Sequence, residues 1–239
     1  MEIYVGTSGW MYDWNEGANF DWYIKYSGLN AIELNASFYR FPFRNQVLGW
    51  SRKTKTKNIR WSIKVHRSIT HFRKLSDKSI DIWNKFKILF EPLDQFIDFY
   101  LFQMPPSFGK TDENIKRVEY FYEKTGLGER FAIEFRHKSW FNESTIKWAE
   151  KLGFTIVSID APIATWIVKS NRNVYLRLHG KEYWYAHDYS EEELKELAEE
   201  SIRLKPDKIY VFFNNNHWML ENARKMYNIL LQYAKKIEK

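Results

Sequence analysis

Residues 131–140, FAIEFRHKSW, contain the pattern that indicates the fold. In this stretch a short strand pattern is followed by a turn that carries charged side chains. Within it, Ile133 and Phe135 alternate with Glu134 and Arg136, which is the period of a β-strand. Similar runs recur about every 30 residues, the length of one strand-and-helix unit. The predicted strands are Ile3–Val5, Ala31–Asn35, Trp61–Val65, Phe99–Gln103, Phe131–Phe135, Thr155–Ile159, Val174–Leu178 and Ile209–Phe213.

Helical patterns lie between these runs, over Ser79–Phe90, Glu191–Leu204 and His217–Ile237. Ser190 and Glu193 have the spacing of a capping box at the start of the second helix. Strands that alternate with helices indicate a parallel sheet. We predict a single (β/α)8 TIM-like barrel domain over residues 1–239, with one short or irregular helical connection after the sixth strand. An open doubly wound sheet is the alternative.

The composition excludes several classes of protein. The chain of 239 residues is 44% hydrophobic, enough for a packed core, and it has no cysteine. Disulfides, thiolate zinc sites, iron–sulfur clusters and a cysteine nucleophile are therefore excluded. The sequence shows no signal peptide and no apolar run of the roughly 18 residues that a membrane helix needs. We expect a soluble, cytoplasmic protein that does not bind membranes.

Each strand pattern has one apolar and one polar face, and we expect the polar faces to point into the barrel. The polar side chains fall at the C-terminal ends of the strands, where barrel enzymes build their sites. The residues placed at these ends are Gly6, Ser8, Glu33, Asn35, Lys64, His66, Gln103, Glu134, Arg136, Asp160, Arg177, His179 and Asn214. The alternative is a structural ion network, in which Glu33 and Glu134 neutralise Lys64 and Arg177.

We interpret part of this set as catalytic. Glu134 or Glu33 would be the general base and His179 a general acid. Strand spacing and tilt predict about 6–8 Å between the two carboxylates, a gap that fits a water or a small substrate. Lys64, Arg136 and Arg177 would hold an anion, because arginine binds phosphate or carboxylate bidentately and lysine binds it as a point charge.

Further substrate-binding candidates lie at the strand ends and in the loops that follow them. His71 and His137 are candidate proton shuttles, and the rings of Trp10, Tyr39 and Trp140 could stack on a base or a sugar. The alternative for the two histidines is hydrogen bonding to loop backbone, and the alternative for the rings is packing over the end of the barrel. Hydrogen bonding is the expected contribution of Asn35, Gln103, Asp160 and Asn214.

A cofactor is not indicated, although a divalent metal stays open. Glu33, Glu134, Asp160 and His179 could together bind a hard cation. Lys64 and Arg177 argue against it, because they bring positive charge to the same space. We therefore assign no metal ligand.

Seven ordered segments carry a family resemblance. They are GTSGWMYDW (6–14), IELNASFYRFP (32–42), ITH (69–71), LFQMPPSF (101–108), IEFRHKSWF (133–141), YLRLHG (175–180) followed by Tyr189, and VFFNNN (211–216) with ENA at 221–223. On these segments the chain resembles the YecE-like family, domain of unknown function 72. The resemblance implies a TIM barrel and supplies no activity. Barrels of the xylose-isomerase and endonuclease IV type are similar at the level of the fold alone.

The sequence therefore favours an enzyme, a hydrolase or lyase that acts on a phosphorylated or nucleic-acid-related substrate at the C-terminal face of the barrel. A carbohydrate-active barrel that uses Glu33 and Glu134 is one alternative, and a non-catalytic nucleic-acid-binding module is another. The net charge of +7 is weak evidence for a polyanionic partner, because the densest basic run, residues 52–60, precedes a strand and so lies at the other end of the barrel. The sequence leaves the oligomeric state open.

Overall fold

The computed structural model describes residues 1–237. The strands in this part of the chain are β1 (Glu2–Thr7), β2 (Ala31–Leu34), β3 (Arg60–Lys64), β4 (Ile97–Gln103), β5 (Phe131–Glu134), β6 (Thr155–Ala161), β7 (Ala164–Trp166), β8 (Asn173–Leu178) and β9 (Lys208–Phe213). The α-helices are α1 (Phe20–Tyr26), α2 (Arg44–Thr54), α3 (Ile80–Leu89), α4 (Asp112–Thr125), α5 (Glu143–Leu152), α6 (Glu191–Arg203) and α7 (Met219–Ile237).

The strand order is that of a (β/α)8 barrel, as predicted. The strands follow one another as β5-β4-β3-β2-β1-β9-β8-β6, and a further pairing of β5 with β6 closes the ring. Short β7 lies outside the ring and pairs antiparallel with β6. This hairpin occupies the connection after the sixth strand of the barrel, where the sequence predicts a short or irregular helical connection, and no helix lies between β6 and β8.

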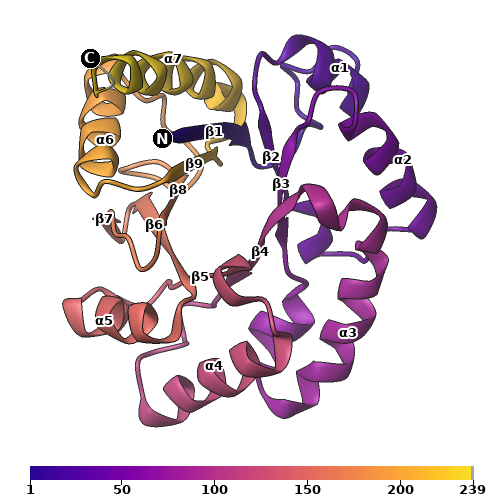
Figure 1. The fold of residues 1–239 in the computed structure, drawn as a ribbon, viewed down its shortest axis with the longest axis vertical. Coiled ribbons are helices and arrows are strands. Elements are labelled where there is room, and N and C mark those ends of the chain that lie inside the picture. The colour runs from indigo at the N-terminus through magenta and orange to yellow at the C-terminus, as the bar shows by residue number, and fades with distance from the viewer. Residues whose placement is uncertain (238–239) are drawn as a thin grey trace. The chain divides into compact units, whose positions relative to one another are not determined.

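The chain divides into two compact units, residues 1–33 with 157–239 and residues 34–156. In the first unit, β1 pairs in register with β9 and β9 with β8, and all of these pairings are parallel. The long helix α7 covers β1 and β9 and packs beside α6 (Figure 1). Gly6 is required here, because a Cβ at this position would lie 2.3 Å from the Ala31 carbonyl oxygen. Its absence lets β1 and β2 pair closely.

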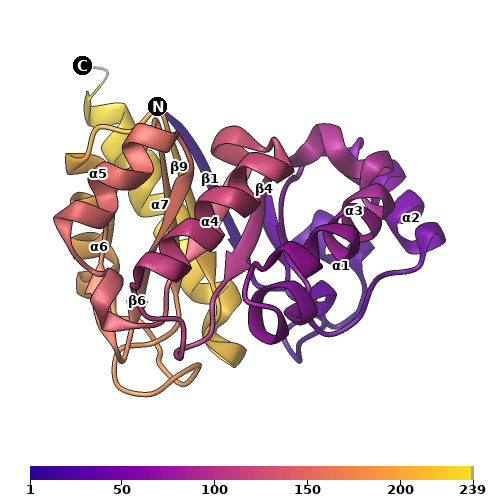
Figure 2. The same cartoon turned by 90° about the horizontal axis from the view of Figure 1, so that it is seen from below.

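In the second unit, β3, β4 and β5 pair in parallel, and α3 and α4 pack against each other (Figure 2). Aromatic rings fill the space between these helices and the strands. Phe102 stacks on Phe131 at 4.2 Å and contacts Trp83 and Phe121 at 5.4 and 5.6 Å between ring centroids. Much of the aromatic content of this unit therefore belongs to the core, where large rings bury the most apolar area.

Local signals set the helix ends. Thr111 and Asn142 accept hydrogen bonds from backbone amides at the starts of α4 and α5, and Gly126 and Gly153 end these helices in the left-handed conformation. The predicted capping box of Ser190 and Glu193 is present at the start of α6. Within residues 1–237, none of the helices has the length and apolarity that crossing a bilayer requires.

Candidate functional site

Glu33, at the end of β2, lies in the first unit and is fully buried. Arg177 on β8 donates to both of its carboxylate oxygens, from Nη2 at 2.6 Å and from Nε at 2.9 Å. The hydroxyls of Ser8 and Tyr175 each add a hydrogen bond of 2.7 Å, one to each oxygen. Four donors thus occupy the carboxylate, which makes Glu33 an anchor for Arg177 rather than an open general base.

His179 lies next to this pair. Its Nε2 atom lies 3.4 Å from Nη1 of Arg177, and its Nδ1 atom lies 3.3 Å from Nδ2 of Asn214. A guanidinium group can only donate, so a hydrogen bond from Arg177 to Nε2 competes with protonation of that atom.

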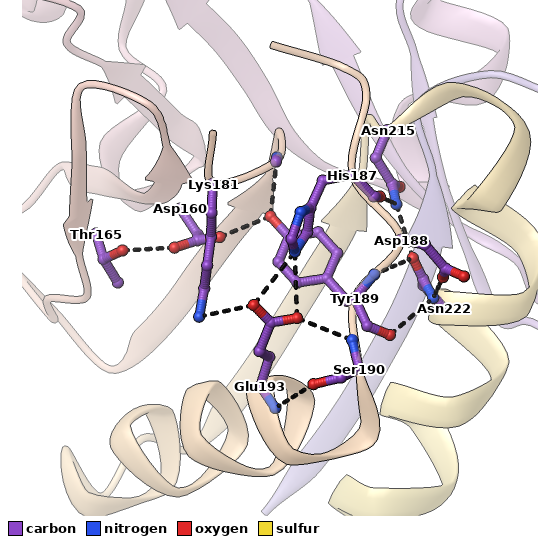
Figure 3. A network of polar contacts seen from close by, with 11 residues as sticks. Asp160, Thr165, Lys181, His187, Asp188, Tyr189, Ser190, Glu193, Asn215 and Asn222 are labelled. Atoms are coloured by element: carbon purple, nitrogen blue, oxygen red, sulfur yellow. Dashed lines mark hydrogen bonds and ion pairs between the residues drawn. The ribbon is translucent and has the colours of Figure 1, made fainter. Parts of the chain in front are cut away.

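Asp160, at the end of β6, belongs to a different network of the same unit (Figure 3). Its carboxylate accepts hydrogen bonds from the hydroxyls of Thr165 at 2.5 Å and Tyr189 at 2.6 Å. The Tyr189 hydroxyl in turn accepts a hydrogen bond from the backbone amide of Gly180. These contacts tie the long loop between β8 and α6 to the end of β6, so the structure assigns Asp160 a supporting role.

The four side chains considered for a metal are not grouped as one ligand set. Within residues 1–237, no cluster of three or more histidine, aspartate or glutamate side chains is arranged to hold an ion. Glu33 is bonded to Arg177, and Asp160 to Thr165 and Tyr189. The Glu33 carboxylate already pairs with the guanidinium of Arg177, which is positively charged and has no lone pair to offer a cation.

The second unit brings together Glu134, Arg136 and Gln103 at the adjacent ends of β4 and β5. Glu134 is fully buried and forms an ion pair with Nε of Arg136, a residue that is 8% exposed. Nη2 of Arg136 also donates to the Gln103 side-chain oxygen at 3.2 Å. Gln103 and Glu134 are partners in the β4–β5 register, so the strand pairing itself sets this geometry.

Lys64, at the end of β3, lies in the same unit and is 6% exposed. Its Nζ atom lies 4.5 Å from the centre of the Phe38 ring, a cation–π distance. The ring of His71 also meets Phe38, edge-on at 4.8 Å between ring centroids. The Phe38 ring therefore contacts both Lys64 and His71.

His71 has an altered acidity. Burial of the ring, together with the positive charges of Lys64, Arg136 and Arg67, lowers the pKa of His71 from 6.5 to about 4. Its Nδ1 atom lies 2.9 Å from the hydroxyl of Thr70. The imidazole is therefore neutral at pH 7 and lies in a positive electrostatic potential, which is a common condition in sites that bind anions.

The remaining candidates separate into buried and exposed groups. Trp140 is fully buried between Phe135 and Phe108, and Trp10 is 8% exposed and packs on Phe20. These two tryptophans belong to the core, so the predicted stacking on a substrate is corrected to a packing role for both.

Two loop residues have local roles and one is open to solvent. His137 accepts the Ser139 amide as a cap of a short 3-10 turn, and Asn35 begins another such turn, over Ala36–Phe38. Tyr39 is 63% exposed. The predicted distance between Glu33 and Glu134 stays a prediction.

The sequence analysis does not identify the partners within these groups. The hydrogen bond from the Tyr175 hydroxyl to Glu33 could have been predicted from the strand period, because Tyr175 and Arg177 share a face of β8. The contact of Lys64 and His71 through Phe38 has no such signal, because it depends on the path of the loops after β2 and β3.

Comparisons with known proteins agree with this architecture. A DUF72 family protein from Enterococcus faecalis V583 superposes with a TM-score of 0.82 at 22% identity, over 96% of this chain and 95% of that one. A DUF72 family protein from Thermotoga maritima MSB8 gives 0.79 at 28% identity, with both chains fully covered. D-psicose 3-epimerase from Clostridium cellulolyticum H10 gives 0.57 at 10% identity, over 99% and 96%, a likeness of fold alone.

No curated protein matches the chain. A family model, described as a protein of unknown function, DUF72, matches residues 4–239. The resemblance inferred from the seven sequence segments is thereby confirmed over nearly the whole length. The chain belongs to the DUF72 family and has its TIM-barrel fold.

Proposed function

We propose that the chain is an enzyme, a hydrolase or lyase, that binds a phosphorylated substrate at the C-terminal ends of β3, β4 and β5. The observation that carries this proposal is the depressed pKa of His71 beside two nearly buried cations, Lys64 and Arg136. Burying charge is costly unless it is paired, and Glu134 pairs with Arg136 in this group. The positive charges of Lys64, Arg136 and Arg67 that disfavour the imidazolium form of His71 would also attract a phosphate.

Each side chain has a role in this proposal. Lys64 and Arg136 hold the anion, the lysine as a point charge and the arginine through its planar donors. Gln103 and Glu134 fix the orientation of Arg136. Glu134 is the general base, and His71 is the second group that handles a proton.

His71 links binding to chemistry. The neighbouring cations help to keep it neutral in the free protein. When a phosphate dianion binds between them, its negative charge raises the pKa of His71 toward its ordinary value. The imidazole then becomes an effective proton carrier only while substrate is present. In a hydrolase, Glu134 would take a proton from the attacking water, and His71 would give a proton to the leaving oxygen as its bond to phosphorus breaks. In a lyase, Glu134 would take the proton from the carbon next to the one that loses phosphate, the electron pair of that C–H bond would form the double bond, and His71 would protonate the departing phosphate.

The carbohydrate alternative has weaker support. It needs Glu33 and Glu134 as an acid–base pair, yet four donors already occupy both oxygens of Glu33. D-psicose 3-epimerase, a sugar-converting protein of similar structure, shares only the fold.

A substrate panel tests the proposal. p-Nitrophenyl phosphate, bis-p-nitrophenyl phosphate, nucleotides and sugar phosphates are assayed beside unphosphorylated p-nitrophenyl glycosides. We expect turnover of a phosphorylated compound, with a loss of at least 100-fold in the Glu134→Gln variant. Because this change also removes the buried counter-ion of Arg136, circular dichroism must show that the variant is folded at the assay temperature. The matched control is Glu150→Gln, on the exposed side of α5, which should retain full activity. Unaltered turnover in Glu134→Gln, or turnover of glycosides alone, contradicts the assignment.

A further inference from the structure

The positive charge of the chain is concentrated in one segment. Residues 34–76 contain 11 lysines and arginines and no aspartate or glutamate, whereas the rest of the chain has 26 basic against 30 acidic residues. The net charge is therefore +11 in this segment and −4 elsewhere. The segment belongs wholly to the second unit and includes the loops that follow β2 and β3.

In these loops, large aromatic rings are exposed and arginines lie over them. Tyr39, Phe43 and Phe72 are 63%, 67% and 70% exposed. Cζ of Arg67 lies 5.8 Å from the Tyr39 ring centre and 5.5 Å from that of Phe72, and Cζ of Arg40 lies 5.7 Å from the Phe43 ring. We call Tyr39, Arg40, Phe43, Arg67, Phe72 and Arg73 the Arg67 surface.

An open hollow extends the Arg67 surface beyond Phe72. It has a volume of about 450 Å³ and is lined by Phe72, Arg73, Ser76, Asp77, Lys78 and Arg117. Three of these side chains are cations and one is an anion, and Arg117 forms an ion pair with Glu113 on the same helix. The hollow thus continues the combination of ring and positive charge.

We propose that the Arg67 surface binds single-stranded nucleic acid. Phosphates are drawn to the arginines, and unpaired bases stack on the exposed rings, the two contacts that define general single-strand binding. A duplex hides its base faces and cannot use the rings. The inference does not depend on catalysis, because binding is measured without turnover.

The geometry favours a nucleic acid over a lipid surface. Arginines lie at cation–π distance from Tyr39, Phe43 and Phe72, so a ring that enters acyl chains would carry a guanidinium group with it. In a nucleic acid the base and its phosphate are adjacent, so one nucleotide can occupy a ring and an arginine together. Charge alone, without the rings, would not distinguish a single strand from other polyanions.

Fluorescence anisotropy with a labelled 12-nucleotide single strand tests the proposal on the full chain. We expect micromolar affinity that falls steeply with salt. Phe72→Ala and Tyr39→Ala leave the charge unchanged and should each weaken binding about 5- to 100-fold, the range measured for loss of one base-stacking ring. Arg67→Ala should weaken binding and reduce the salt dependence.

The charge control is the double variant Lys55→Ala/Lys57→Ala, which removes two exposed cations before β3, away from the loops that follow it. It should change affinity less than threefold. Circular dichroism establishes that each variant is folded. The proposal is overturned if the ring variants bind like the parent, if the control weakens binding as much as they do, if the matching duplex binds more tightly, or if only vesicles with anionic lipid bind. Unchanged oligonucleotide affinity in Glu134→Gln separates this result from the test of catalysis.

Discussion

The pKa of His71 depends on the side chains that surround it. Its pKa lies near 4 because burial and three neighbouring cations disfavour the imidazolium form. In the unfolded chain the same group titrates near 6.5. Between these values the unfolded state binds more protons than the folded state, so stability falls as the pH drops from about 6.5 to about 4.

Replacing His71 by Gln removes this contribution. We expect the variant to lose less stability than the parent between pH 7 and pH 4.5, by about 1–2 kcal/mol after allowance for the solvent around a half-buried ring. Urea denaturation at the two pH values measures the difference. The other histidines are common to both proteins and cancel in the comparison. Equal losses in the two proteins would mean that His71 titrates normally.

The pair of Glu33 and Arg177 makes a second prediction at this scale. Both side chains are fully buried, and each oxygen of Glu33 has two donors. Glu33→Gln removes the negative charge and leaves a buried guanidinium without its counter-ion, at a cost of about 3–5 kcal/mol. The free energy of unfolding in urea measures this cost. A loss below about 1 kcal/mol would show that the pair contributes little to stability.

Among the elements, the segment between β8 and α6 is held by contacts at several points. Asn215 donates to the His187 carbonyl and Asn222 donates to Asp188 (Figure 3). Glu193, the third residue of α6 and a member of its capping box, also bonds with Lys181 and His187. These bonds fix the loop beside Asp160, so we expect each buried bond to contribute to stability.

Tyr189→Phe tests this element. The change removes one hydroxyl, so the buried carboxylate of Asp160 keeps the Thr165 bond and loses the Tyr189 bond. The Gly180 amide loses its acceptor at the same time. We expect a loss of about 1–3 kcal/mol in thermal or urea unfolding. The same exchange at Tyr120, which is 41% exposed on α4, should change stability by less than about 0.5 kcal/mol. Similar effects at the two positions would argue against the buried network.

For the whole molecule, the sequence alone predicts the fold closely. All eight barrel strands and the helices at 80–89, 191–203 and 219–237 lie where apolar periodicity and the Ser190 capping signal place them. The sequence indicates that Glu33 and Glu134 could neutralise Lys64 and Arg177. It does not pair these residues individually, because alternation gives the face of a side chain and not its partner. The roles of Phe38 and Phe72 depend on loop conformation, which has no period to read.

The distribution of charge also belongs to the whole chain. A net charge of +7 is weak evidence for a nucleic-acid partner. The proposal of single-strand binding depends instead on the charge of +11 in residues 34–76 and on the exposed rings of that segment. The same segment supplies Lys64, Arg67 and His71, so the proposed anion site and the Arg67 surface share one positive field. Raising the ionic strength should therefore weaken both the binding of phosphate and the binding of single-stranded nucleic acid.

The most direct test of the proposed anion site is the NMR titration of the His71 imidazole, with and without saturating inorganic phosphate. We predict a pKa of about 4 for His71 in the free protein. With phosphate bound, the pKa rises by at least one unit, and this rise is lost in Lys64→Met. A pKa near 6.5 in the free protein, or a value that phosphate leaves unchanged, would contradict the account.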